Sequence, residues 1–161
     1  MTDPAVGTGH PPEFLMGLLN RTLRVLLPTP LAGPLRNQFM LLKFTGRKTG
    51  RQFEIPVTAH QIDGALYALA NAGWKANFRG DHDVTVVHGG RTTAMRGELI
   101  DDPDAVADLA RRLAQSYGPK RAQTMMGLKF RDDASVPSLQ EFRDAAHRDK
   151  LVAIQFTPVT Q

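Results

Sequence analysis

The sequence predicts an α+β fold, a small antiparallel barrel with helices attached. Strand-like segments follow one another through residues 39–100, and turn signals separate them. Helix-like segments fill residues 101–147, and one last apolar segment at residues 151–157 closes the chain. Hairpin-linked strands followed by helices are typical of α+β folds rather than of alternating βαβ units.

The composition is that of one globular domain. Of the 161 residues, 42% are hydrophobic and 22% are charged. We therefore expect residues 1–12 to be a flexible N-terminus and residues 13–161 to form a single domain. The absence of cysteine excludes disulfides, thiolate nucleophiles and zinc–thiolate sites. We recognise no signal peptide and no apolar stretch of about 18 residues, so we expect a cytoplasmic protein.

Residues 13–27 predict the first helix. Apolar side chains recur there at near-helical spacing, and Pro28 and Pro30 end the pattern. We expect this apolar stripe to pack on the rest of the domain. In a second interpretation the helix and its arginines touch a lipid surface, which would make the protein peripheral to a membrane.

The strands begin with Phe39–Thr45, a short apolar run that predicts a buried strand. Gly46–Gly50 turns the chain into Phe53–His60, where apolar and polar residues alternate. Asp63-Gly64 is a hairpin-turn signal, and the strand Ala65–Ala70 follows it.

A second hairpin is predicted after a short helical turn at Trp74–Arg79. Its strands are Asp83–His88 and Arg91–Ile100, and Gly89-Gly90 joins them. With the closing strand Leu151–Thr157, we expect about six strands, mostly antiparallel.

The helical half begins at Asp101–Asp104, where acidic residues and a proline favour a helix N-terminus. The helix predicted at Ala105–Tyr117 ends at Gly118-Pro119. Residues 121–130 and 137–147 predict two weaker helices. The helices are therefore inserted before the last strand.

The charge balance favours anionic partners. The net charge is +4 and the sequence pI is about 9.8, and the basic residues form short clusters that suit a local groove. These clusters are Arg47-Lys48 with Arg51, Lys75 with Arg79, and Arg91 with Arg96. Sparse aromatic residues and the lack of a known motif disfavour a nucleic-acid-binding module.

No catalytic group or metal site can be identified from the sequence. The histidines are scattered, without the spacing of a metal-ligand pair on one helix face. The motifs G-x-S-x-G, G-x-x-x-x-G-K-[ST] and G-x-G-x-x-G are missing. If the protein is an enzyme, its reactive group therefore belongs to a cofactor.

The segment Thr45–Arg51 is the strongest candidate for binding an anion. Its two glycines allow tight or left-handed backbone that exposes N–H groups to a ligand. Arg47 offers a planar fork for phosphate or carboxylate, Lys48 a mobile charge, and Thr49 a hydroxyl donor. The alternative interpretation is a solvated basic turn.

A second candidate is the segment Asn71–Gly80, which contains the one tryptophan of the chain, Trp74. A tryptophan in a polar loop can stack on a planar ligand. It can equally close the end of a barrel, and composition alone favours that second role.

In order and spacing, these segments resemble the deazaflavin-dependent nitroreductase family of the flavin/deazaflavin oxidoreductase split-barrel superfamily. The motif T-G-R-K-T-G occupies Thr45–Gly50, and the pair Pro56-Val57 follows in the next strand. The motif W-x-x-N-F then supplies Trp74, Asn77 and Phe78. The resemblance covers residues 39–100 well and 151–158 loosely.

The resemblance implies a split β-barrel that binds the reduced deazaflavin coenzyme F-420, with FMN as the less favoured cofactor. It assigns the basic turn to the phosphate and tail of the coenzyme, and the Pro-Val strand and the tryptophan segment to the deazaflavin ring. The predicted cofactor-binding residues are Arg47, Lys48, Thr49, Gly50, Pro56, Val57, Thr58, Asn71, Ala72, Gly73, Trp74, Lys75 and Asn77.

The chain departs from the nitroreducing members of the family near the expected acceptor. They carry tyrosine where this chain has Thr58, and they carry late tyrosines, whereas this chain has only Tyr67 and Tyr117. Cofactor binding therefore carries over better than substrate choice.

We predict an oxidoreductase that transfers hydride from the deazaflavin to a quinone-like, enone or nitro acceptor. The alternatives are an FMN- or haem-binding split barrel, and a non-enzymatic carrier of fatty acyl chains or other lipids. His60 or solvent would supply a proton where the reaction needs one. The sequence leaves both monomer and homodimer open.

Overall fold

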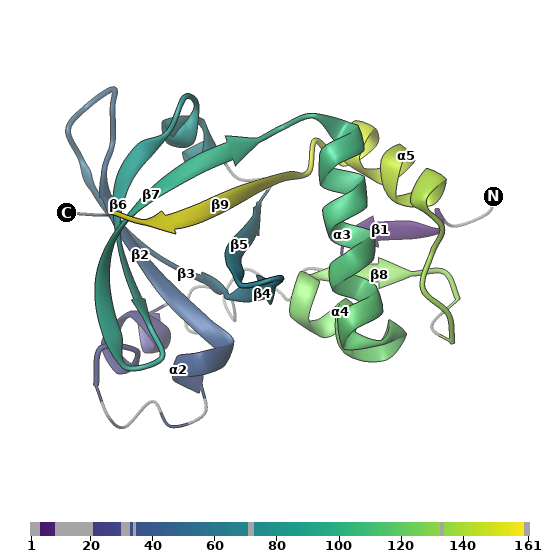
Figure 1. Cartoon of the computed structure of the whole chain (residues 1–161), viewed down its shortest axis with the longest axis horizontal. Helices are drawn as coiled ribbons and strands as arrows, with labels where there is room; N and C mark the ends of the chain where they lie inside the picture. Colours follow the sequence, from purple (N-terminus) through teal and green to yellow (C-terminus); the bar gives the residue numbers. More distant parts are fainter. Residues whose placement is uncertain are drawn as a thin grey trace. The chain divides into compact units, whose positions relative to one another are not determined.

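A computed structural model describes residues 4–8, 21–29, 33, 35–70, 73–132 and 134–159 (Figure 1). Part of the predicted flexible N-terminus lies outside these residues, and Val6–Thr8 forms the strand β1. Of the predicted first helix, the described part is helical at residues 21–26. None of the described helices is long and apolar enough to cross a membrane.

Seven strands form one sheet in the order β3-β2-β6-β7-β9-β5-β4, and the sheet curls into a half-barrel (Figure 1). The pairs β2–β3, β2–β6, β6–β7 and β4–β5 are antiparallel. The strands are β2 (Phe39–Thr45), β3 (Gln52–Thr58), β4 (His60–Ile62), β5 (Ala65–Ala70), β6 (His82–His88), β7 (Arg91–Ile100) and β9 (Val152–Pro158).

The sheet has one strand more than the six that the sequence predicts, because the predicted strand Phe53–His60 is interrupted. The N–H of Ala59 donates to the carbonyl of Gln38 at 2.9 Å. This bond extends the pairing with the β2 side by one residue beyond Thr58, the last residue of β3. His60 begins a separate strand that pairs with β5 across the Asp63-Gly64 turn. Both residues of this turn have positive φ, as the hairpin signal predicts.

Contacts within the chain define two compact units. The barrel unit consists of Pro11–Ala68, Ala72–Leu99 and Ile154–Gln161. The helical unit consists of Met1–His10, Leu69–Asn71 and Ile100–Ala153.

The two faces of the sheet in the barrel unit have separate apolar clusters. In the β2–β3 pair, Met40 lies opposite Val57 and Leu42 opposite Ile55, and all four pack in the cluster of the inner face. Side chains alternate along a strand. Leu41 therefore faces outward, where it packs with Leu23 and Leu27 from residues 21–27.

The helical unit contains α3 (Pro103–Tyr117), α4 (Pro119–Met126) and α5 (Leu139–Asp149). Asp102 caps α3 by accepting from the N–H of Ala105 at 3.2 Å, as the acidic start predicts. Ser138 and Glu141 form a capping box at the start of α5. Val106, Ala146 and Leu151 form a buried cluster with Leu69 and Ile100.

The prediction of one helix over residues 121–130 is wrong in its second half. α4 ends at Gly127, whose φ of 65° is the left-handed conformation of a helix C-cap. Leu128–Phe130 is the strand β8, which pairs antiparallel with β1. A short helix, α2 (Leu35–Gln38), precedes β2 and was not predicted.

Candidate functional site

The turn between β2 and β3 is closed by its own backbone. The N–H of Gly46 donates to the carbonyl of Arg51 at 2.7 Å, and the N–H of Gly50 donates to the carbonyl of Gly46 at 3.0 Å. Gly50 has a φ of 72°, which favours glycine. A Cβ on Gly46 would lie 2.7 Å from a ring carbon of Phe53, so the first glycine makes room for that ring. Both glycines of the motif therefore have structural roles.

The turn also offers hydrogen-bond donors to an anion. Among the described residues, no partner accepts from the backbone N–H of Lys48 or Thr49. The Lys48 side chain is exposed and forms no ion pair with a described residue. Arg51 is exposed as well, and its guanidinium carbon lies 5.3 Å from the centre of the Phe53 ring. Adjacent N–H groups flanked by cations suit a phosphate or carboxylate.

The guanidinium of Arg47 forms hydrogen bonds with other groups of the chain. Nη1 donates to the carbonyl of Arg79 at 2.6 Å, Nη2 donates to the carbonyl of Asp81, and Nε donates to Nδ1 of His82 at 3.4 Å. Nε2 of His82 lies 2.7 Å from the carbonyl of Thr45, which can only accept. In this arrangement Nε2 of His82 donates to Thr45 and Nδ1 accepts from Arg47.

Asn77 joins the turn to the tryptophan segment. Its Oδ1 accepts from the N–H of Arg47 at 2.9 Å, and its Nδ2 donates to the carbonyl of Trp74 at 2.9 Å. The segment is the 3-10 helix η2 (Gly73–Phe78). The structure therefore brings together the two segments that carry the family resemblance.

An aromatic cluster on the inner face supports this junction. Phe78 is fully buried and lies edge-on to Phe44, with 5.0 Å between the ring centres. Trp74 is half-buried and lies 6.1 Å from both rings. The tryptophan therefore packs against the barrel's inner cluster without being fully buried.

The predicted residues of β3 divide between the two faces of the sheet. Val57 packs on the same inner cluster as Trp74. Pro56 and Thr58 alternate with Val57 and are half-buried on the outer face, where Pro56 is paired with Leu41. The structure does not bring Pro56 and Thr58 to the face on which Trp74 packs.

The remaining predicted residues are only partly described. Asn71 and Ala72 lie outside the described residues. Gly73 begins η2, and Lys75 is half-buried within it. The sequence did not identify Asp81 or His82, although Gly80-Asp81 carries an ordinary turn signal.

His60 is a poor candidate for the proton donor. Its side chain is 2% exposed, and burial lowers its pKa to about 4. The imidazole is therefore neutral at pH 7. Among the described residues, no three His, Asp or Glu side chains gather as metal ligands.

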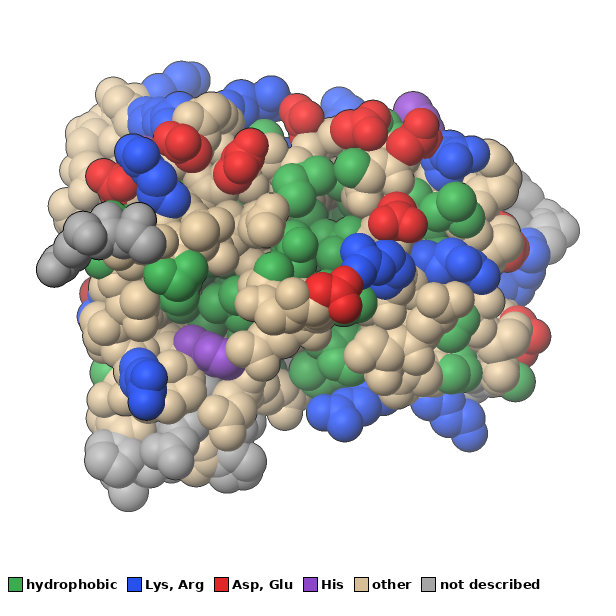
Figure 2. Space-filling view, in the orientation of Figure 1, with side chains coloured by type: hydrophobic (Ala, Val, Ile, Leu, Met, Phe, Trp, Pro, Cys, Tyr) green, Lys and Arg blue, Asp and Glu red, His purple; other side chains and the backbone are tan. Residues whose placement is uncertain are grey.

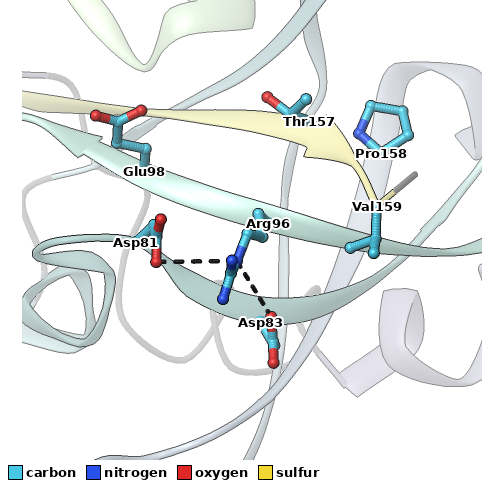
Figure 3. A pocket seen from close by; sticks show the side chains of 7 residues that line it. All are labelled: Asp81, Asp83, Arg96, Glu98, Thr157, Pro158 and Val159. Atoms are coloured by element: carbon cyan, nitrogen blue, oxygen red, sulfur yellow. Dashed lines mark ion pairs between the residues drawn. The ribbon is translucent and has the colours of Figure 1, made fainter. Parts of the chain in front are cut away.

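A pocket of about 530 Å³ in the barrel unit is lined in part by Asp81, whose carbonyl accepts from Arg47 (Figure 3). Nε of Arg96 lies 3.8 Å from Asp81 and 3.4 Å from Asp83. Glu98 adds a third carboxylate, so the pocket is acidic although Arg96 belongs to a predicted basic cluster. Its lining residues are Asp81, Asp83, Arg96, Glu98, Thr157, Pro158 and Val159.

The basic side chains on one face of the molecule form no single patch. Lys and Arg side chains are scattered over the face drawn in Figure 2 rather than gathered in one patch. The fold and this site define an α+β protein with a curled antiparallel half-barrel sheet and an anion-suited turn at one strand end.

No protein-family model and no curated protein matches the sequence. The chain also aligns with solved structures at low similarity. A structure described as a domain-swapped dimer is 14% identical, covering 92% of this chain and 100% of its own, with a TM-score of 0.47. The conserved hypothetical protein Rv2991 from Mycobacterium tuberculosis is 11% identical, covering 99% and 87%, with a TM-score of 0.46.

The protein Atu2129 from Agrobacterium tumefaciens, of unknown function, is 11% identical, covering 81% of this chain and 57% of its own, with a TM-score of 0.43. Likenesses of this degree name no family and no activity.

Proposed function

We propose that the protein is a deazaflavin-dependent reductase whose basic turn binds the anionic part of coenzyme F-420. One observation carries the proposal: the N–H of Arg47 donates to Oδ1 of Asn77 across 30 positions of sequence. The two motifs of the resemblance thus meet within one unit, where the tryptophan segment can support the turn that would bind the coenzyme.

The donors of the turn suit the phosphodiester and the acidic tail of that coenzyme. Lys48 and Arg51 provide exposed positive charge, and the N–H groups of Lys48 and Thr49 provide donors without a described partner. A hydrogen bond to a charged group contributes about 1.5–3 kcal/mol, so a few such contacts are sufficient for micromolar binding. Lys48, Thr49 and Arg51 would hold the phosphate and tail.

The deazaflavin ring needs an apolar surface. Pro56 and Thr58 are half-buried on the outer face of β3, the strand that leaves the basic turn. β3 is at one end of the sheet order, where a proline is tolerated because no ladder bond is needed on the free side. These two residues would line the ring, while Val57 and Trp74 support the strand and the junction from the inner face.

The bound coenzyme, when reduced, supplies a hydride for an organic acceptor. The residues of the chain bind and orient the reactants and exclude water. The buried neutral His60 is not placed to supply a proton, so solvent is the proposed source. Thr58 lacks the ring and phenol of tyrosine, which favours quinone-like or enone acceptors over nitroimidazoles.

A comparative titration tests the proposal. Purified protein is titrated with reduced F-420, FMN and haem, and F-420 is expected to bind most tightly. Oxidation of reduced F-420 is then followed by absorbance with a quinone, an enone and a nitroimidazole. Binding of FMN or haem in preference to F-420 would contradict the proposed cofactor.

A matched pair of variants locates the binding. Lys48→Gln removes one exposed cation from the turn, and Lys120→Gln removes one from an exposed position of α4. Only the first is expected to weaken F-420 binding, and the loss should shrink as salt is added. Equal losses in both would indicate a general effect of net charge.

A further inference from the structure

The guanidinium of Arg47 faces a neighbouring loop rather than only solvent. It donates to the carbonyls of Arg79 and Asp81 and reaches the ring of His82. The backbone N–H of the same residue binds Asn77. One residue of the turn therefore contacts both sides of the loop that connects η2 to β6.

This loop has a conformation that needs support. Gly80 has a φ of 70° and Asp81 a φ of 71°, and Asp81 is one of three described non-glycine residues with positive φ. A left-handed conformation costs a side-chain-bearing residue free energy, although Asp tolerates it better than most. The bonds from Arg47 satisfy the carbonyls on either side of Gly80 and so oppose relaxation of the loop.

Arginine suits this role and lysine does not. Its planar fork presents several N–H groups at once, so that two carbonyls are bound in a fixed geometry. Lysine carries the same charge on one mobile ammonium group. Lys48, the next residue, has no described partner and remains available to a ligand.

We infer that Arg47 is a positioning residue: its guanidinium holds the Arg79–Asp81 loop, and through it Trp74 and Asn77, in the arrangement that binds the coenzyme. The coenzyme part of this inference rests on the proposed function. Within the site, Lys48 and the free N–H groups of the turn contact the anion, and Arg47 acts through the loop.

The test compares Arg47→Lys, Arg47→Gln and Lys48→Gln with the wild type, first without coenzyme. The conformation of the loop is followed by hydrogen exchange at residues 79–82 and by the fluorescence emission of the one tryptophan, Trp74. Both Arg47 variants should speed exchange at residues 79–82 by about tenfold or more and shift the emission. Lys48→Gln should change neither, and exchange at Leu128–Phe130 in the helical unit should stay constant in all three variants.

Titration with F-420 at several salt concentrations completes the test. Arg47→Lys keeps the charge and should still lose at least about tenfold in affinity, with the salt dependence of the wild type. Lys48→Gln should lose affinity and also salt dependence.

Three results would overturn the inference. The first is unchanged exchange in Arg47→Gln, the second is full affinity in Arg47→Lys, and the third is a loss of protection that extends equally to Leu128–Phe130. If the wild type binds no F-420, the proposed function fails, and exchange and Trp74 emission still decide the role of Arg47.

Discussion

The basic turn and the acidic pocket both contact the loop Arg79–Asp81, and the sequence predicts positive charge for both. At the turn, Lys48 has no described partner, so the predicted charge remains. In the pocket, Arg96 is matched by Asp81 and Asp83, which lie in and just after the loop. Charge clusters along the sequence therefore predict local potential only where the fold adds no opposite charge.

Asp81 of the loop Arg79–Asp81 takes part in both regions. The carbonyl of Asp81 accepts from Arg47, while its carboxylate pairs with Arg96. A change in the loop should therefore affect the turn and the pocket together, whereas a change in either arginine should affect one side first.

The largest expected effect comes from removing the support beneath the loop. Phe78 is 0% exposed, and a Cβ on Gly97 of β7 would lie 2.6 Å from its ring. Phe78→Ala would leave a cavity that its close neighbours cannot fill, and should lower the free energy of unfolding by about 3–5 kcal/mol. Chemical denaturation measures this loss.

The control for this prediction is Phe142→Ala in the helical unit, where Phe142 is 1% exposed. It should cost a similar free energy and leave Trp74 emission unchanged under native conditions. A loss below about 1 kcal/mol for Phe78→Ala would mean that the contact between β7 and the loop is not tightly packed.

The second prediction concerns the loss of folding stability at low pH. This loss limits the pH range in which the two regions can be compared. Burial lowers the pKa of His60 from 6.5 to about 4. Between these values the unfolded chain binds a proton that the folded chain does not, so stability falls as pH falls from 6.5 to 4. The shift corresponds to about 3 kcal/mol, lost progressively over this interval and not further below it.

His60→Gln should remove this part of the pH dependence, whatever it does to stability at pH 7. Chemical denaturation at pH 7, 5.5 and 4 measures the pH dependence of stability. The variant His88→Gln, at a half-buried histidine, is the control. Parallel curves for wild type and His60→Gln would show that His60 is not the group responsible.

Much of the fold follows from short-range signals in the sequence. The strands Phe39–Thr45, Ala65–Ala70 and Arg91–Ile100 have their predicted bounds, because apolar patterns and glycine turns specify them locally. The end of α4 could have been recognised from Gly127. The pairing of β8 with β1 could not, since it joins segments more than a hundred residues apart.

The contact between the basic turn and the tryptophan segment is a finding of the structure, and the motifs imply only that both segments serve one site. Sequence alone does not show that the guanidinium of Arg47 binds two backbone carbonyls, because carbonyls are common to all residues. The sequence motif also groups Pro56 with Val57. These neighbouring residues of β3 point to opposite faces of the sheet, because side chains alternate along a strand.

The third prediction compares one cation from each region. Lys48→Gln should weaken the proposed F-420 binding by about 1.5–3 kcal/mol, since it removes the charged contact proposed for this residue. Arg96→Gln should change binding by less than about 0.5 kcal/mol, because its ion-pair partners are Asp81 and Asp83 and not groups of the turn. Affinities at low and high salt measure both, and similar losses in the two variants would mean that the distinction between the regions is wrong.

The smallest expected effect separates backbone strain from charge at Asp81. Asp81→Asn removes the ion pair between Arg96 and Asp81, whose side chains are 57% and 47% exposed. This change should lower the free energy of unfolding by at most about 0.5 kcal/mol. Asp81→Gly removes the ion pair and also the strain of a φ of 71°. Relative to Asp81→Asn, it should therefore raise the free energy of unfolding by about 0.5–1 kcal/mol. Thermal and chemical denaturation of both variants give this difference. A glycine variant less stable than the asparagine variant would show that the Arg47 bonds, rather than the conformational preference of residue 81, determine the shape of the loop.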